Sequence, residues 1–337
     1  MRTRRSSQMR VFGVLSLLAL IAGPAEPAHK PLVGTIDQLL NLPVRPFAIA
    51  HRGFGDNAGE DPSRPIENTV PAVRAGFMAG ASVVEVDVQI TKDGVAVFHD
   101  DFLPDLTCLN QLTLAELQSR QPEVPSLEAV LNQARKFNQP AGPLSGLLIV
   151  ELKAAAPLCD PADTQEHLIV STVAGVIRHM GMTRQVLLTS FSPALLYLAA
   201  AEAPEIPRIL SISGLQFLTA EEVQQRLGLS VKLIDKQLDL GLQWAEIGTV
   251  FRLPGYRSVA EVLSTAGITA VRVVEADLFF LGSAGAAFVD VLHGVGLKAL
   301  GFTATTPAEW FFLQSIGLDG IYTNDIPFGV QHEAPIP

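Results

Sequence analysis

Short strand-like runs alternate with helix-like runs along most of this chain, and this alternation restricts the folds that it can adopt. The candidate strands cover residues 47–52, 83–90, 146–153, 185–190, 207–211, 270–274, 298–303 and 319–323. Apolar residues recur with helical spacing over residues 69–79, 127–137, 167–179, 286–293 and 307–315. Eight strands separated by helices are the plan of a (β/α)8 barrel, although a doubly wound sheet has the same local pattern.

The first residues of the chain are typical of an export signal. Arg2, Arg4, Arg5 and Arg10 precede an apolar run over residues 11–22, and small residues and prolines follow up to residue 28. This order is that of a secretory signal peptide, and an uncleaved N-terminal anchor is the alternative. We therefore predict an exported protein, periplasmic or secreted, with a signal over 1–28, an extension over 29–46 and one barrel domain over 47–330.

The composition favours a buried core and argues against nucleic-acid binding. Apolar residues make up 48% of the chain and charged residues 17%, and the formal net charge is −10. Nucleic-acid backbones are bound by clustered Lys and Arg side chains, which such an acidic chain lacks. The sequence contains no sign of an obligate protein partner, so a small molecule is the expected ligand.

The run from Val83 to Ile90 carries the first chemical signal. Side chains alternate between the two faces of a strand, so Glu85 and Asp87 lie on one face and Val84, Val86, Val88 and Ile90 on the other. In a barrel, the two carboxylates would point into the lumen, where a divalent cation such as Mg²⁺ or Ca²⁺ would offset their charge. An exposed polar face on an antiparallel strand is the alternative.

A second strand and two histidines strengthen the case for a metal site. Glu151 and Lys153 end an apolar run and share one face. His51 and His99 each close a strand-like run at the same predicted end, and Arg52 follows His51. A cation, two proton carriers and two positive side chains suit displacement at a phosphoryl centre. The chain contains no Gly-x-Ser-x-Gly sequence, which argues against a serine hydrolase.

These residues occur in short motifs that resemble those of the glycerophosphodiester phosphodiesterase family. The matching pieces are His51-Arg52-Gly53, Glu67-Asn68-Thr69, Glu85-Val86-Asp87-Val88, Thr91-Lys92-Asp93-Gly94, His99-Asp100, Glu151-Leu152-Lys153 and, more weakly, the run from Gly320 to Asp325. The likeness is dense over residues 47–153 and thinner from 185 to 325. The resemblance implies a TIM barrel that hydrolyses glycerophosphodiesters to glycerol 3-phosphate and an alcohol.

The resemblance also implies a role for each matching residue. Glu85, Asp87 and Glu151 would hold the divalent cation, Mg²⁺ or Ca²⁺. His51 and His99 would act as general acid and base, in an order that the sequence leaves open. Arg52 and Lys153 would contact the phosphate, and Glu67 and Asn68 would support the site.

Two departures from the family pattern bear on the substrate. The loop over 54–66 is long and is expected to overhang the mouth of the barrel, and Phe302 stands in a run where the family often has tryptophan. Two alternatives therefore stay open. One is a phospholipase D that acts on lysolipids or sphingolipids, with an apolar groove formed by Phe102, Leu103, Phe279 and Phe280. The other is a lipid-binding barrel without catalysis.

The chain has two cysteines, Cys108 and Cys159. In an exported protein such a pair can form a disulfide, and two buried free thiols are the alternative. Placed in the family's barrel, the two cysteines follow neighbouring strands. We therefore predict a disulfide that joins two loops at the catalytic mouth.

Overall fold

The computed structural model describes residues 34–41, 46–57, 59–97, 102–105, 107–137, 146–155, 159–162, 164–218 and 255–333. The predicted signal over 1–28 and the predicted proton carrier His99 lie outside the described residues.

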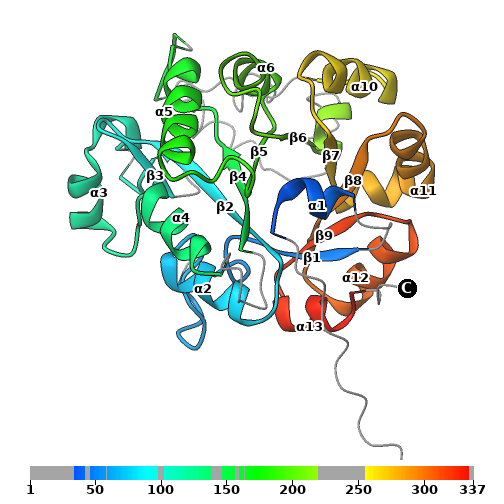
Figure 1. Cartoon of the computed structure of the whole chain (residues 1–337), viewed down its shortest axis with the longest axis horizontal. Coiled ribbons are helices and arrows are strands. Elements are labelled where there is room, and N and C mark those ends of the chain that lie inside the picture. Colours follow the sequence, from blue (N-terminus) through cyan, green and yellow to red (C-terminus); the bar gives the residue numbers. More distant parts are fainter. Residues whose placement is uncertain are drawn as a thin grey trace, which may run out of the picture. The chain divides into compact units, whose positions relative to one another are not determined.

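Eight parallel strands close into a barrel, because β1 pairs with both β2 and β9 (Figure 1). The barrel strands are β1 (Phe47–Ala50), β2 (Val83–Ile90), β4 (Leu147–Leu152), β5 (Val186–Ser190), β6 (Arg208–Ile212), β7 (Val273–Asp277), β8 (Lys298–Ala304) and β9 (Gly320–Thr323). The short β3 (Val95–Val97) folds back antiparallel on β2. The closed order confirms the predicted (β/α)8 barrel and excludes the doubly wound sheet, whose edge strands would stay unpaired.

Helices follow the strands and surround the barrel (Figure 1). They are α1 (Ile36–Leu40), α2 (Val70–Met78), α3 (Leu114–Arg120), α4 (Leu127–Arg135), α5 (Glu166–His179), α6 (Pro193–Glu202), α10 (Val259–Ile268), α11 (Leu278–Gly294), α12 (Pro307–Ser315) and α13 (Ile326–Gln331), with 3-10 turns η1 (Leu109–Gln111) and η2 (Gly214–Phe217). The hydroxyls of Thr69, Ser126 and Thr306 each accept the backbone N–H three residues later, which starts α2, α4 and α12.

The alternation along β2 separates two cores. Val84, Val86 and Val88 belong to a buried cluster between the strands and the outer helices. Val83 belongs instead to the lumen cluster, together with Ile36 of α1. The amino end of the lumen is thus filled with apolar side chains, and the inward polar residues of β2 lie nearer to the carboxyl end.

The seventh barrel strand begins later than the sequence predicts. The prediction was 270–274, whereas β7 spans Val273–Asp277. Ala270 has a φ of 49° and lies in a turn, and the guanidinium of Arg208 donates to the Ala270 carbonyl at 3.1 Å. Apolar residues lie on both sides of this boundary, which hides it in the sequence. The shift places Glu275 inside the strand, and Asp277 caps α11 by accepting the Phe280 N–H.

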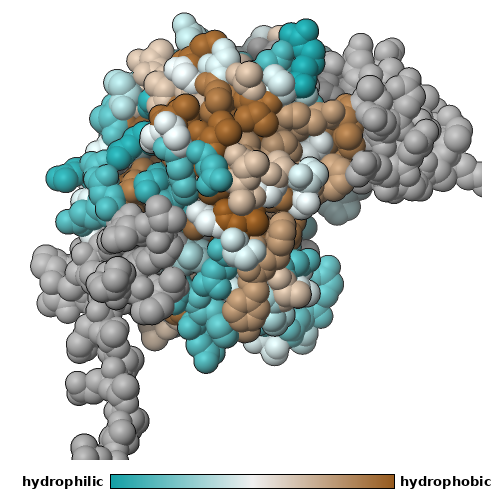
Figure 2. Space-filling model, turned by 90° about the vertical axis from the view of Figure 1, so that its right-hand side faces the viewer, coloured by the Kyte–Doolittle hydropathy of each residue, from teal (hydrophilic) through white to brown (hydrophobic). Residues whose placement is uncertain are grey.

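Helices α10 to α12, on the right of Figure 1, carry several large exposed apolar side chains. These are Ile268, Phe279, Val291, Val295 and Phe311. Figure 2 shows this side of the molecule, where hydrophobic residues gather between hydrophilic ones. Among the described residues, no helix is both long enough and apolar enough to span a membrane.

Candidate metal centre and active site

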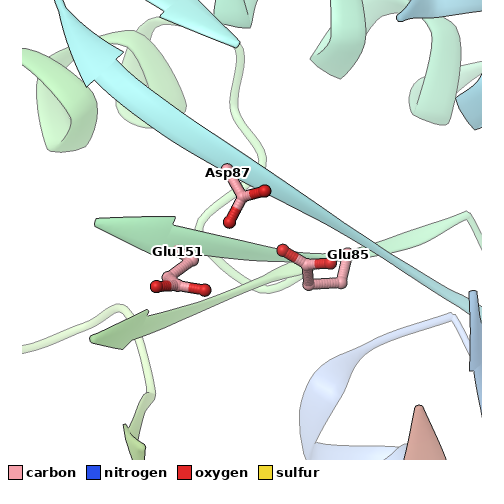
Figure 3. Close-up of side chains that lie close together, drawn as sticks. All are labelled: Glu85, Asp87 and Glu151. Carbon is pink, nitrogen blue, oxygen red and sulfur yellow. The ribbon is translucent and has the colours of Figure 1, made fainter. Parts of the chain in front are cut away.

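Three carboxylates from two neighbouring strands converge at the lumen (Figure 3). Asp87 of β2 and Glu151 of β4 are register partners, and Glu85 lies two residues before Asp87 on the same face. One oxygen from each carboxylate lies within 4.8 Å of the other two. Glu85 and Asp87 are 2% and 1% exposed, so the cluster is removed from bulk water. The predicted inward face of β2 therefore exists, and the alternative of an exposed polar face is wrong.

Two cationic side chains offset part of this buried negative charge. The ammonium of Lys153 lies 2.6 Å from Glu151 Oε1 and 2.9 Å from Asp87 Oδ1. Arg52 Nε lies 3.2 Å from Asp87 Oδ2. Burial opposes both cations, but the surrounding carboxylates outweigh it and hold the pKa of Lys153 and of Arg52 above their ordinary values. Both side chains predicted to contact phosphate thus lie at the carboxylates.

The two cations do not neutralise all of the negative charge, so Glu85 and Glu151 can each take up a proton or share a cation. Burial and the adjacent charge of Asp87 raise the pKa of Glu85 to about 8. Burial also raises the pKa of Glu151 to about 7, although Lys153 opposes this shift. Raised carboxylate pKa values in a cleft are typical of functional sites, because only a bound cation or a proton relieves the repulsion.

The residues present fit a divalent cation. Glu85 Oε1 is buried and has no hydrogen-bond partner among the described residues, whereas Glu85 Oε2 accepts the Arg52 N–H at 2.8 Å. An unpaired buried carboxylate oxygen is costly unless an ion uses it. Three carboxylates are a hard oxygen donor set, as Mg²⁺ and Ca²⁺ require. Glu85, Asp87 and Glu151 are therefore the residues that could hold such a metal.

The predicted supporting residues contact this cluster from the start of α2. Asn68 Nδ2 donates to Asp87 Oδ2 at 2.9 Å, and Asn68 Oδ1 accepts the Asp87 N–H at 3.0 Å. Glu67 Oε1 accepts from Arg52 Nη1 at 2.9 Å. The residues of this short segment thus restrain both a carboxylate and a cation of the site.

His51 lies at the carboxyl end of β1, close to the carboxylates. Its Nδ1 is 2.8 Å from Asn324 Oδ1 and 3.0 Å from Asp56 Oδ1. Burial opposes the charged ring, but the hydrogen bond to Asp56 and the charge of Glu85 outweigh it and raise the pKa of His51 to about 9. The surrounding carboxylates therefore favour the protonated form of His51.

A buried polar network in the lumen was missed by the sequence analysis. Glu275 of β7 accepts hydrogen bonds from Tyr322 of β9, from Ser211 at 2.6 Å and from Thr189 at 2.8 Å. Burial raises the pKa of Glu275, and these hydrogen bonds oppose the shift. The misplaced start of β7 hid Glu275, and a strand beginning at Val273 would have revealed it.

Asp56 and Asn324 were not predicted as site residues either. The only signals in the sequence were the position of Asp56 just after His51-Arg52-Gly53 and the position of Asn324 within the weak match from Gly320 to Asp325.

Cys108 and Cys159 form a disulfide with a Cα–Cα distance of 5.5 Å. Cys108 precedes η1, which follows β3, and Cys159 follows β4. The disulfide thus joins the segment that follows β3 to the segment that follows β4.

Two of the four residues predicted to line an apolar groove for a lipid substrate lie in separate cores. Leu103 is buried with Leu109 and Leu117, whereas Phe280 of α11 is buried in a different cluster. These two residues therefore do not line a common groove.

The sequence pattern of the glycerophosphoryl diester phosphodiesterase family matches residues 51–327, from His51 to the first turn of α13. The chain belongs to this family. The match includes every residue of the metal cluster, His51, and the Asp56 and Asn324 side chains beside it.

Curated relatives within the family match shorter segments. A glycerophosphocholine phosphodiesterase of Eremothecium gossypii is 38% identical over 100 residues, which are 29% of this chain and 7% of that protein. Glycerophosphodiester phosphodiesterase 1 of Rattus norvegicus is 37% identical over 84 residues, 25% of this chain and 23% of that protein. The chain thus spans only a small part of the length of these relatives.

Solved phosphodiesterase structures share the fold over nearly their whole length. A phosphodiesterase of this type from Silicibacter pomeroyi has a TM-score of 0.62 and 21% identity, covering 87% of this chain and 94% of that one. An Oleispira antarctica phosphodiesterase, solved with its product sn-glycerol-3-phosphate, has a TM-score of 0.59 and 20% identity, covering 85% and 96%. At these identities the likeness establishes the barrel fold.

Proposed function

We propose that this protein hydrolyses glycerophosphodiesters to glycerol 3-phosphate and an alcohol, and that it requires a divalent cation. The observation that carries the proposal is the meeting of three carboxylates, two of them buried and one of these with an unpartnered oxygen, beside His51 in a barrel of this family. The product named for the Oleispira antarctica relative supports the same substrate class.

The cation, Mg²⁺ or Ca²⁺, would be held by Glu85, Asp87 and Glu151. Its chemistry there is to neutralise negative charge that develops on the phosphoryl oxygens during displacement. Lys153 and Arg52 supply further positive charge at the same place, each held by Asp87. Together these groups favour the binding of a phosphodiester anion.

His51 is the proposed general acid. Its Nδ1 is engaged by Asp56 and Asn324, so Nε2 is the nitrogen that faces the reaction. Nε2 gives its proton to the oxygen of the leaving alcohol as the bond from phosphorus to that oxygen breaks. Water or the glycerol 2-hydroxyl forms the new bond to phosphorus and loses its proton to a base. Attack by the 2-hydroxyl would give a cyclic phosphate, which water would then open to release glycerol 3-phosphate. His99, which lies outside the described residues, is the proposed base on sequence grounds alone.

Lysolipids are a second candidate substrate class, favoured by an aromatic wall near the site. Phe302 of β8 lies edge-to-face against Phe191 at 5.8 Å and against Tyr322 at 6.0 Å between ring centroids. The Tyr322 ring in turn lies edge-to-face with His51 at 6.3 Å. An apolar wall beside the proton donor would accept an acyl chain or the carbon face of a head group.

Release of glycerol 3-phosphate from glycerophosphocholine tests the proposed function, and lysophosphatidylcholine tests the second substrate class. We expect turnover that EDTA abolishes and that Mg²⁺ or Ca²⁺ restores. Glu85→Gln should lose cation dependence together with activity. His51→Ala should lose at least roughly 10²-fold in kcat while still binding the cation. Glu123→Gln, at an exposed position on the surface, is the matched control.

Absence of turnover on every diester and lysolipid, with cation present, would contradict the proposal. It would favour the non-catalytic lipid-binding barrel instead.

We also propose that the protein is exported and is periplasmic or secreted. The arginine-rich start, the apolar run over 11–22 and the Cys108–Cys159 disulfide support this proposal. N-terminal sequencing of the protein after cell fractionation tests it. An intact Met1 in a cytoplasmic fraction would contradict export, and an intact Met1 in a membrane fraction would indicate an uncleaved anchor.

A further inference from the structure

We infer that Asp56 is a positioning residue for His51, brought to the imidazole by the loop between β1 and α2. This inference rests on the proposed function, because it takes His51 to be the proton carrier. The loop comprises residues 53–67, all described except residue 58.

Two acceptor oxygens lie next to His51 Nδ1. Asn324 Oδ1 lies 2.8 Å and Asp56 Oδ1 lies 3.0 Å from this nitrogen. Asn324 Nδ2 donates to Asp56 Oδ2 at 2.8 Å, and the Asp56 N–H donates to Asn324 Oδ1 at 3.2 Å. The carboxylate thereby sets the orientation of the Asn324 amide, whose oxygen must face the ring. Both atoms near Nδ1 are acceptors, so Nδ1 carries hydrogen and Nε2 is the nitrogen left for the substrate.

Asp56 also brings a negative charge next to the His51 ring. The Asn324 amide can fix the tautomer, but it carries no charge to favour the imidazolium. The charged groups that face His51 are Asp56 on the loop, Glu85 on β2, Glu275 on β7 and the opposing Arg52. A bound cation would neutralise the effect of Glu85, and Glu275 is engaged by three hydroxyls. Asp56 is the carboxylate in hydrogen-bonding contact with the ring, so its charge would persist with the cation in place.

Hydrogen bonds within the loop restrain the position of Asp56. Asn57, the next residue, is 4% exposed, and its side chain is the centre of the loop. Its Nδ2 lies within hydrogen-bond distance of three backbone carbonyls, those of Asp61 at 2.9 Å, Arg64 at 3.1 Å and Pro65 at 3.2 Å. Its N–H donates to Glu67 Oε2 at 3.0 Å. Buried amide groups satisfied in this way give a loop a single conformation.

The residues before Asp56 are equally restrained. Gly55 has a φ of +83°, and a Cβ on it would lie 2.4 Å from the Asn324 carbonyl oxygen, so only glycine allows this approach. The Arg64 guanidinium donates to the carbonyls of Phe54 and Asn324 and thus ties the loop to the end of β9. Asp56 is 48% exposed in its side chain, yet both its neighbours are held. The long loop that the sequence predicts to overhang the mouth therefore delivers a carboxylate to His51.

The test compares Asp56→Asn with Asp56→Glu and with the control Asp290→Asn, an exposed position on α11. Steady-state kinetics with glycerophosphocholine are measured across pH with saturating cation. We expect Asp56→Asn to lower kcat roughly 10-fold to 100-fold with KM nearly unchanged. The pKa of the acidic group in the kcat/KM profile should fall, because the imidazolium loses its carboxylate. Asp56→Glu should regain part of the loss, and Asp290→Asn should match the wild type.

A purely structural role would give a different result. If Asp56→Asn kept wild-type kcat and an unchanged pH profile, the inference would be overturned. Should that variant not fold, Arg64→Met loosens the loop from outside the site, and the same loss of kcat is expected. Wild-type kcat and an unchanged pH profile in folded Arg64→Met would also overturn the inference.

The effect of Asp56 on His51 can be measured independently of the hydrolytic activity. NMR titration of the His51 ring in the wild type and in Asp56→Asn needs no turnover, and a lower midpoint in the variant supports positioning even in an inactive protein. An equal midpoint in the two proteins, in an active enzyme, would remove the role of Asp56 and leave the hydrolytic function intact.

Discussion

Asn68 holds Asp87 at two points, with Nδ2 donating to Oδ2 at 2.9 Å and Oδ1 accepting the Asp87 N–H at 3.0 Å. Both residues are buried. One side chain therefore fixes the backbone and the carboxylate of a predicted metal ligand together. Asn68 itself has a φ of 55°, a left-handed conformation that asparagine tolerates better than most residues.

Replacing Asn68 should destabilise the fold and loosen the cation site. Asn68→Ala strands the Asp87 N–H and removes one of the two polar contacts of Asp87 Oδ2, which keeps Arg52 Nε at 3.2 Å. An unpaired buried group costs about 1–3 kcal/mol, so a loss of that size is expected. Asn68→Gly makes the same deletion but accepts the positive φ, and it should be less unstable by roughly 1 kcal/mol. Urea unfolding of the three proteins measures both differences. Equal midpoints for wild type and Asn68→Ala would contradict the role of the double contact.

The stability of the metal-free protein should depend on Glu85 in a pH-dependent way. Folding raises the pKa of Glu85 from 4.5 to about 8, so the neutral form is the one that the fold favours. The contribution of Glu85 to stability is present below pH 4.5 and is lost as pH rises through about 8. In EDTA, Glu85→Gln should therefore gain stability relative to the wild type as pH rises across this window.

Added Mg²⁺ or Ca²⁺ should reverse the order, because a ligand that binds only the folded state stabilises it. Thermal melts of both proteins, with EDTA and with cation, measure the effect. If the difference in melting temperature between the wild type and Glu85→Gln were constant across pH, this result would contradict the raised pKa of Glu85.

Reducing the disulfide between Cys108 and Cys159 should lower stability without removing the cation site. The bond closes a loop with a sequence separation of 51 residues, for which the chain-entropy contribution is about 4 kcal/mol. Cys108→Ser with Cys159→Ser should unfold at clearly lower denaturant concentration than the oxidised wild type, and it should match the reduced wild type. Neither cysteine belongs to the cluster of Glu85, Asp87 and Glu151, so calorimetry should find similar cation affinity. Identical unfolding of oxidised and reduced protein would contradict the expected constraint.

The lumen network around Glu275 should respond differently to polar and apolar replacement. Glu275→Leu strands the Tyr322 hydroxyl and leaves the Thr189 and Ser211 hydroxyls only each other at 2.7 Å, and we expect a loss of roughly 1–3 kcal/mol. Glu275→Gln keeps the shape and removes the charge. Since burial raises the pKa of Glu275, the wild type loses stability relative to Glu275→Gln as pH rises above the ordinary range of a carboxyl group. Denaturant unfolding at acidic and alkaline pH measures both effects, and a more stable Leu variant would contradict the network.

Local sequence determined which residues form the strands and which of them point inward. The alternation of Glu85, Val86 and Asp87 needs no distant partner, because it follows from the two-residue period of a strand. Glu151 could be assigned in the same way, since it ends an apolar run. The boundary of β7 could not be assigned, because Ala270 and Val271, which precede the strand, are as apolar as Val273 and Val274 within it.

Only the tertiary structure decided which groups stand beside these residues. His51 meets Asn324 across 273 positions of the chain, and Asp56 reaches the same nitrogen through a loop whose conformation depends on Asn57. Glu275 and Tyr322 meet in the lumen from β7 and β9, the strands on either side of β8. Strand periodicity is a local property that the sequence contains, whereas the partners of a buried charge are set by closure of the sheet and by loop packing, which no local pattern records.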